Sequence, residues 1–157
     1  GNRLAQILRE QFGYNVIHDK TKYDIVNGKL DRHEAYTQSK AGVKKQLKKY
    51  PSISLILDIH RDGVNDGTRL VTEINGKKTA QIMYRFENLA LGLQMKVNAE
   101  CYYPGFTRRN YVNAYEYNLS LGKQCMLIEV GAQTNTYQEA KNAAEPLAVL
   151  IKKVLGE

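Results

Sequence analysis

The stretch Ser52-Ile-Ser-Leu-Ile-Leu-Asp-Ile-His60-Arg-Asp62 decides the fold of this chain. Its apolar run is rich in β-branched residues, is too short for a helix and follows Pro51, which cannot continue one. Such a run is typical of a central strand that is covered on both faces, as in parallel sheets. Polar residues begin abruptly at its carboxyl end, which is where α/β sheets bind ligands. We therefore expect a functional site at this end of the strand, with His60 in it.

A second run, Cys125-Met-Leu-Ile-Glu129-Val-Gly131, has the same design, an apolar strand that ends in an ionisable residue and a glycine. A buried carboxylate without a partner is costly and has a raised pKa. Glu129 is therefore either paired structurally or used as a general base. Two buried strands that each deliver a titratable group to one edge predict a single site containing His60 and Glu129.

Composition limits the class of protein. At 157 residues the chain is long enough for one domain with a sizeable core, and no apolar run approaches the length of a membrane span. The net charge of +7 favours a polyanionic partner such as nucleic acid, anionic lipid or a cell-wall polymer, although a merely soluble basic surface explains it equally well. Neither cysteine has metal-type spacing, and Cys125 reads as a small core residue.

The expected fold is α/β, with a mostly parallel central sheet flanked by helices and a β-hairpin insertion at 68–84. The hairpin signal is Asn75-Gly76 between two β-rich runs, 68–74 and 77–84. Hydrophobic periodicity predicts helices over 4–12, 34–50, 87–100 and 136–155. The segment 14–19 reads as a short strand, and 20–31 and 107–122 read as loops at the active edge.

Each later helix carries one further expectation. In 34–50 we expect Tyr36, Val43 and Leu47 to face inward and Lys44, Lys45, Lys48 and Lys49 to form a solvated face that suits the helix dipole. The helix over 87–100 carries Leu89, Leu93 and Val97 on one face. In 136–155 the pattern predicts a capping box of Thr136 and Glu139, an inward face of Leu147, Ile151 and Val154, and a kink or break at Pro146.

The site residues allow two readings. His60 could be a hydrogen-bonded structural histidine, but its place after a buried strand favours a zinc ligand oriented by Asp58 or Asp62. His18 ends the predicted short strand and could approach the same edge, whereas His33 starts a helix and reads as a surface residue. The chain contains no glycine-rich nucleotide-binding motif, nucleophile elbow, HExxH motif or pair of CxxC motifs.

Four motifs in order resemble the stage II sporulation protein P family. They are Ile53 to Asp62, Leu127-Ile-Glu-Val-Gly-Ala-Gln-Thr-Asn-Thr136, Val16-Ile-His-Asp-Lys-Thr21 and Asn75-Gly-Lys-Lys-Thr-Ala-Gln-Ile-Met83, and the resemblance covers essentially the whole chain. The family comprises cell-wall hydrolases related in fold and site to the zinc-dependent N-acetylmuramoyl-L-alanine amidases. It implies an amidase-like fold over a single domain, 1–157.

The resemblance implies that His60 matches a zinc ligand and Glu129 the catalytic glutamate, with Zn²⁺ as the cofactor. The implied reaction is cleavage of the amide between muramic acid and the stem peptide, and also of peptide crosslinks. The implied setting is extracytoplasmic, at the sporulation septum and engulfing membrane, with an anchor outside this chain and with sporulation proteins D and M as partners.

Three departures from the family pattern qualify this expectation. The family's first strand, which bears further zinc ligands, has no counterpart before Gly1, and part of a loop near 86–87 is missing. Because catalytic zinc takes three protein ligands, we expect the chain alone to be metal-poor and inactive. Where family members often have a histidine in the segment 19–24, this chain has Tyr23.

Two other classes of function stay open. One is a non-catalytic module of the same fold that holds anionic wall polymer on its basic face. The other is a basic α/β nucleic-acid binder, which charge and tyrosine content alone support, since the chain has no recognised nucleic-acid motif. The enzyme reading requires His60 and Glu129 at one edge of the sheet.

Overall fold

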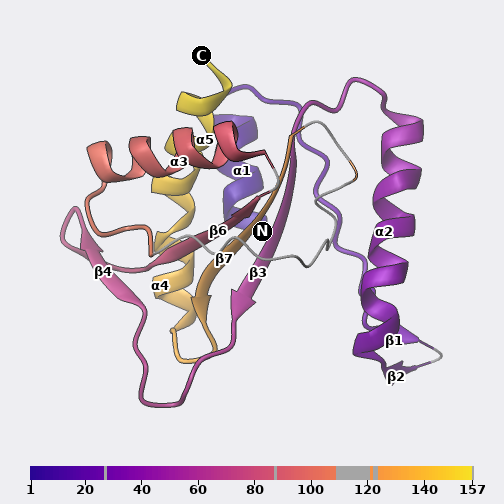
Figure 1. The fold of residues 1–157 in the computed structure, drawn as a ribbon, viewed down its shortest axis with the longest axis horizontal. Coiled ribbons are helices and arrows are strands. Elements are labelled where there is room, and N and C mark those ends of the chain that lie inside the picture. The colour runs from indigo at the N-terminus through magenta and orange to yellow at the C-terminus, as the bar shows by residue number, and fades with distance from the viewer. Residues whose placement is uncertain (27, 87, 109–120, 122–123, 157) are drawn as a thin grey trace.

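A three-stranded sheet lies at the centre of the protein (Figure 1). The computed structural model describes residues 1–26, 28–86, 88–108, 121 and 124–156. The strand order is β3 (Ile56–Asp62), β7 (Cys125–Ala132), β6 (Ile82–Phe86), in which β3 runs parallel to β7 and β6 runs antiparallel to it. The fold is therefore α/β as predicted, but its central sheet is small and mixed rather than mostly parallel.

The first deciding strand is at the edge of this sheet, not at its centre. β7 has a neighbour on each side and is buried along nearly its whole length, whereas β3 pairs only with β7 among the described residues and is half-buried. An apolar run indicates that the two faces of a strand are covered, and it carries no information about how many of its edges are paired. The prediction of a strand was correct and its central position was wrong.

Three helices cover one face of the sheet: α1 (Asn2–Glu10), α3 (Leu89–Tyr102) and α5 (Ala144–Leu155). Because side chains alternate along a strand, Met126 and Ile128 of β7 point to this side and join the main core. The same core contains buried residues from the three helices, among them Ile7, Leu8, Leu91, Met95, Leu147 and Ile151. Leu147 and Ile151 are buried as predicted.

The other face of the sheet carries a smaller apolar cluster followed by polar groups. Cys125 and Leu127 of β7 pack with Ile56 of β3, and the next residues of the same parity are Asp58, His60 and Glu129. The predicted role of Cys125 as a small core residue is confirmed, since it is buried within this cluster. The alternation that fills the core on one face therefore places the ionisable groups on the other.

The helix α2 (Arg32–Lys49) lies on the β3 side of the sheet, with the segment 14–24 between them (Figure 1). A small hairpin of β1 (Ile25–Val26) and β2 (Lys29–Leu30) lies at the N-terminal end of this helix. The four predicted outward lysines of α2 are exposed. Tyr36 was predicted to face inward but is 51% exposed. It lies in the second turn of α2, shortly after the small hairpin in the chain.

The segment 14–19 does not form the predicted strand. It is extended but pairs with no strand among the described residues. Instead, Arg9 of α1 donates to the carbonyl of Val16, at 2.6 Å from Nη2 to the oxygen. Farther along, the Tyr23 hydroxyl donates to Asp19 at 2.5 Å. Side-chain hydrogen bonds, and not a β-ladder, therefore hold this segment among the described residues.

The Asn75-Gly76 hairpin is confirmed between β4 (Val71–Ile74) and β5 (Lys77–Ala80), with φ of 50° and 73° at the two turn residues. The second predicted run does not continue as one strand. At Gln81 the backbone changes partners, because its N–H donates to Leu70 and its carbonyl accepts from Gly131. The chain then enters the central sheet as β6, a strand that the sequence pattern did not separate from the hairpin.

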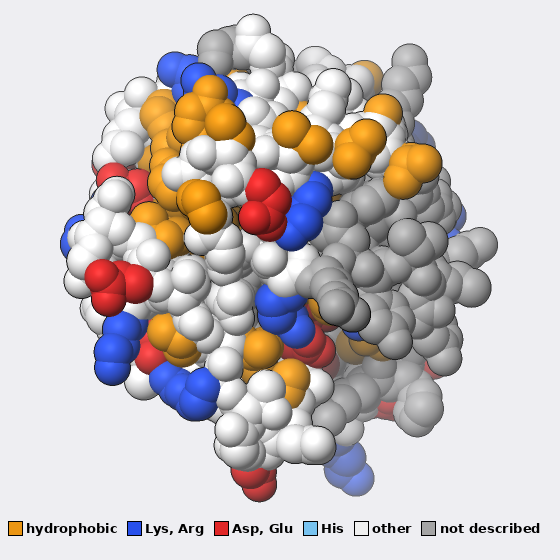
Figure 2. Space-filling model, turned by 60° about the vertical axis from the view of Figure 1, so that its left-hand side comes forward, with side chains coloured by type: hydrophobic (Ala, Val, Ile, Leu, Met, Phe, Trp, Pro, Cys, Tyr) orange, Lys and Arg blue, Asp and Glu red, His pale blue; other side chains and the backbone are white. Residues whose placement is uncertain are grey.

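The apolar face predicted on the third helix points to solvent. In α3 the buried row is Leu91, Met95 and Ala99, whereas Leu89, Leu93 and Val97 are exposed. Both rows are apolar at a spacing of four residues, so periodicity alone cannot choose between them. Hydrophobic side chains are visible along the top of the molecule in Figure 2, at the level of this helix.

The C-terminal helix is broken, as Pro146 predicted. α4 (Tyr137–Asn142) and α5 meet at Ala143, and Pro146 lies in the first turn of α5, where its missing N–H costs no helical hydrogen bond. The capping box of Thr136 and Glu139 is also confirmed. Within the described residues no helix is both long enough and apolar enough to cross a bilayer.

Candidate functional site

The parallel pairing of β3 and β7 sets His60 directly opposite Glu129. On the other side of β7, Met83 of β6 is the register partner of Glu129. The register shifts just after this pair, between His60 and Asp62, where the strands form an irregularity of the β-bulge type. Bulges often re-aim side chains next to active sites. The structure therefore brings the two predicted site residues together at one edge.

His60 is held by Asp58, its neighbour two residues earlier on the same face of β3. The distance between His60 Nε2 and Asp58 Oδ1 is 2.9 Å. This hydrogen bond raises the pKa of His60, and the negative charges of Asp58 and Glu129 act in the same direction, against the opposing effect of burial. A carboxylate that binds one ring nitrogen fixes the orientation of the ring.

Glu129 is a buried carboxyl with one unsatisfied oxygen. Its side chain is 7% exposed, and Oε2 has no hydrogen-bond partner among the described residues. Burial raises the pKa of Glu129, and Asp62 adds to this effect, while His60, Arg85 and Arg108 lower it. A carboxylate with a raised pKa and a free lone pair is suited to accept a proton.

Two arginines complete the charged cluster, and the sequence pattern singled out neither. Arg85 comes from β6, two residues after Met83 and therefore on the same face as Glu129. Arg108 donates from Nη2 to Asp62 Oδ2 at 2.8 Å, and its Nε is buried without a partner among the described residues. Arg85 could have been found from the alternation of side chains in a strand, which places it on the same face as Met83. Nothing in the local sequence indicates that Arg108 pairs with Asp62.

The two carboxylates that were predicted as possible orienting groups for His60 have different hydrogen-bond partners in the structure. Asp58 binds the ring, whereas Asp62 is engaged by Arg108 and by the backbone N–H of Gly63 at 2.8 Å. The predicted active-edge loop over 107–122 falls mostly outside the described residues. Arg108, near its start, pairs through its backbone N–H with the carbonyl of Ile82 and so does lie at this edge.

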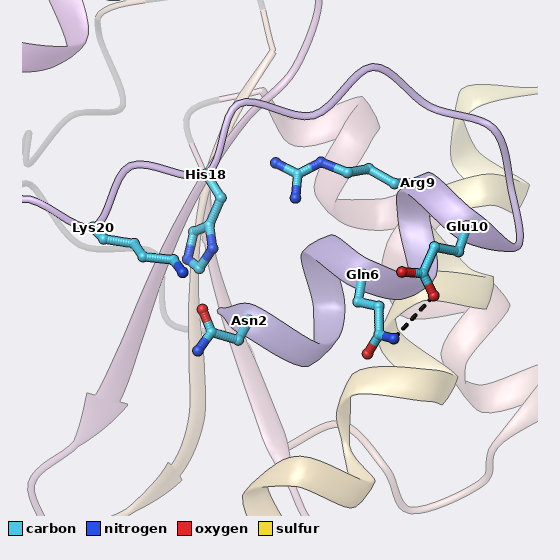
Figure 3. A pocket seen from close by; sticks show the side chains of 6 residues that line it. All are labelled: Asn2, Gln6, Arg9, Glu10, His18 and Lys20. Carbon is cyan, nitrogen blue, oxygen red and sulfur yellow. Dashed lines mark hydrogen bonds between the residues drawn. The ribbon is translucent and has the colours of Figure 1, made fainter.

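His18 lies in a different polar pocket, shown in Figure 3. The pocket has a volume of about 450 Å³ and is lined by Asn2, Gln6, Arg9 and Glu10 of α1 together with His18 and Lys20. Burial, followed by nearby positive charges, lowers the pKa of His18. None of His60, Asp58 and Glu129 lines this pocket. His33 is in the first turn of α2, and its side chain is outside the described part of the structure.

The described residues do not by themselves form a metal centre. No group of three His, Cys, Asp or Glu side chains among them is placed to hold a metal ion. His60 offers one imidazole at this edge, and a catalytic zinc takes three protein ligands.

Comparison with known proteins identified one family. A family model described as Stage II sporulation protein P (SpoIIP) matches residues 1–152, from α1 into α5. Searches of the curated proteins and of the solved structures found no match. The match agrees with the resemblance carried by the four sequence motifs and associates the chain with sporulation.

Proposed function

Because the chain belongs to the stage II sporulation protein P family, we propose that it is a peptidoglycan hydrolase of sporulation. The proposed reaction is hydrolysis of the N-acetylmuramoyl-L-alanine amide bond by zinc-activated water, with stem-peptide crosslinks as a second class of substrate. The observation that carries the proposal is the buried, incompletely paired carboxyl of Glu129 opposite the oriented imidazole of His60.

In this proposal Glu129 is the general base and acid. Its Oε2 accepts a proton from the attacking water and returns it to the departing amine of the stem peptide. A raised pKa brings the carboxyl nearer to the working pH, which increases its efficiency in both steps, and such catalysis contributes roughly 10²–10⁴-fold in rate. Asp58 is a positioning residue, since it holds the ring of His60 in one orientation.

Zinc is the proposed cofactor, and its chemistry would be to lower the pKa of a bound water. A catalytic zinc takes three protein ligands, and the described residues do not assemble such a set. His60 would supply one ligand, and the others would have to come from outside the described residues.

The proposed setting follows from the same family. The substrate is peptidoglycan, the partners are sporulation proteins D and M, and the place of action is extracytoplasmic, at the sporulation septum and engulfing membrane. Anchoring to the membrane would use a segment outside these residues. Nucleic acid is not a proposed partner, since the family match accounts for the sequence motifs without one.

The alternative is a non-catalytic module that binds anionic wall polymer. The net charge of +7 favours it, since such a module needs only a basic surface. The two readings differ in what becomes of purified peptidoglycan sacculi incubated with the full-length protein and zinc. The hydrolase releases stem peptides with a free N-terminal alanine, which mass spectrometry of the soluble fraction detects. A binding module sediments with the sacculi and releases nothing, a result that would overturn the proposal.

A further inference from the structure

The positive charge of this protein is concentrated in one short segment. Residues 20–50 contain nine Lys or Arg residues against three Asp or Glu, a net charge of +6 out of +7 for the whole chain. The remainder is nearly neutral, and the face in Figure 2 shows both signs interspersed. Residues 20–50 form the β1–β2 hairpin and α2, which stand together at one side of the molecule (Figure 1). We call this part the α2 unit.

The exposed lysines of α2 form a basic surface in the C-terminal half of the helix. Lys40, Lys44 and Lys48 follow one another at a spacing of four residues and so form a row along α2. Lys44, Lys45, Lys48 and Lys49 are all exposed, and Lys49 Nζ also lies 5.0 Å from the centre of the Tyr50 ring. Within residues 20–50 the acidic residues are Asp24, Asp31 and Glu34, at the hairpin and the first turn of the helix. Asp19 also lies close to α2, because it binds the Tyr23 hydroxyl that lies against Gly42.

Exposed apolar side chains lie at the other end of the α2 unit, in the hairpin that precedes the helix. Ile25 and Leu30 are register partners in the hairpin and are 45% and 59% exposed. Tyr36, half-exposed, begins the same row along α2 that continues with the lysines. A two-stranded hairpin has no core of its own in which to bury these aliphatic side chains, so they are accessible to an apolar partner.

This combination distinguishes between classes of anionic partner. A soluble polyanion needs only the charges, and single-stranded nucleic acid is bound by aromatic platforms together with basic grooves. An anionic bilayer attracts lysines electrostatically and also accepts aliphatic and aromatic side chains into its interface. Of these three partners, the bilayer is the one that uses both the lysines of α2 and the exposed hairpin residues.

We propose that the α2 unit docks on the surface of an anionic phospholipid bilayer, with the lysines over the headgroups and Ile25 and Leu30 inserted at the interface. The unit lies on the β3 side of the sheet, with the segment 14–24 between α2 and β3 (Figure 1). The inference does not depend on the proposed hydrolysis, because lipid binding requires neither Glu129 nor a metal.

The test is sedimentation of the 157-residue chain with vesicles of phosphatidylglycerol mixed with phosphatidylcholine. We expect binding that weakens with salt and is absent from vesicles of phosphatidylcholine alone. The triple variant Lys44→Glu, Lys45→Glu, Lys48→Glu should partition roughly 100-fold less, at about 1 kcal/mol for each lysine and 1.4 kcal/mol for each tenfold. A matched control reverses three exposed lysines elsewhere, Lys77, Lys78 and Lys141. An equal loss in the control would overturn the proposal, since binding would then follow net charge alone.

Insertion of the hairpin is tested separately. The chain contains no tryptophan, so Leu30→Trp introduces a single fluorescent probe. We expect its emission to shift to the blue on anionic vesicles, and Ile25→Ser with Leu30→Ser to weaken binding while circular dichroism stays unchanged. Two results would overturn the proposal and assign the surface to a soluble polyanion. One is tryptophan emission that does not shift on vesicles. The other is binding that polyglutamate in solution abolishes and that the serine substitutions do not change. Glu129→Gln should bind vesicles like the wild type.

Discussion

Two buried glutamates of this protein respond in opposite ways to their surroundings, and the same substitution should therefore have opposite effects at the two positions. Glu129 has an oxygen without a hydrogen-bond partner among the described residues, and burial raises its pKa. Glu139 also lies in a buried position, which by itself would raise its pKa. The backbone N–H of Thr136, the Asn135 amide and the charge of Arg69 outweigh that effect and lower the pKa.

The contacts set the expected magnitudes. An unsatisfied buried group costs about 1–3 kcal/mol, and Glu129→Gln removes the charge while leaving a polar group in place, so we expect a gain of about 1 kcal/mol. For a chain of this size that corresponds to a rise in Tm of about 2–4 °C. Glu139 accepts from Arg69 Nη2 at 2.5 Å and from the Thr136 N–H at 2.9 Å, so Glu139→Gln should cost about 1–3 kcal/mol.

The pH dependence gives the sharper test. A raised pKa in the folded state means that the wild type loses stability as pH rises through the folded pKa of Glu129. The advantage of Glu129→Gln should therefore be largest at neutral pH and vanish in acid. A lowered pKa means that the contribution of Glu139 is present above its unfolded pKa and is lost as pH falls. The loss of stability caused by Glu139→Gln should therefore also vanish in acid, because there the wild type loses the contribution of its Glu139 carboxylate.

Thermal unfolding followed by circular dichroism between acid and neutral pH measures both effects. Glu139→Gln is the matched control, since it makes the same chemical change in another buried carboxyl. A Glu129→Gln variant that is less stable than the wild type at neutral pH would refute the reasoning, because Glu129 would then be a satisfied structural residue. A gain that does not change with pH would also refute it, since the ionised carboxylate would not be the source of the cost.

Three further predictions follow from single contacts. Asp58→Asn should lower the pKa of His60, which NMR of the imidazole resonances measures. It should also cost more stability below the unfolded pKa of histidine than above it, because a raised histidine pKa stabilises the folded state at acid pH. An unchanged pKa would exclude Asp58 as the orienting group. Gly131→Ala should destabilise the chain by about 1–3 kcal/mol in urea unfolding. The reasons are that Gly131 has φ of 61° and that an added Cβ would lie 2.5 Å from Asn135 Oδ1. The same change at Gly63, where an added Cβ meets no atom of the described residues within 4 Å beyond its chain neighbours, should be nearly neutral. Gly42→Ala should displace the Tyr23 ring, whose hydroxyl would collide with the new Cβ, and so raise amide hydrogen exchange in 19–24 while leaving exchange in β7 unchanged.

Local signals were sufficient where one residue type determines a conformation. Asn-Gly specified the hairpin turn because both residues adopt positive φ there, and Pro146 specified the helix break because it lacks an N–H. The apolar run of β7 specified a buried strand that carries one carboxyl, Glu129. Each of these predictions depended on neighbouring residues alone.

Contacts between distant residues were not accessible in the same way. The pairing of Arg108 with Asp62 spans 46 positions, and the partner change at Gln81 depends on Leu70 and Gly131. α3 presents two equivalent apolar rows, so its buried face is decided by α5 and β6 and not by its own sequence. The candidate site was therefore predictable as the pair His60 and Glu129, but its arginines were not.

The central claim is that Glu129 transfers protons in the hydrolysis of a peptidoglycan amide. The most direct measurement is the rate at which sacculi release peptides with a free N-terminal alanine, for the full-length protein with zinc and for its Glu129→Gln and Glu139→Gln variants. We expect the Glu129→Gln rate to fall roughly 10²–10⁴-fold while binding to sacculi is retained, and Glu139→Gln to keep its activity at a temperature where it is folded. Release by Glu129→Gln at the wild-type rate would contradict the account.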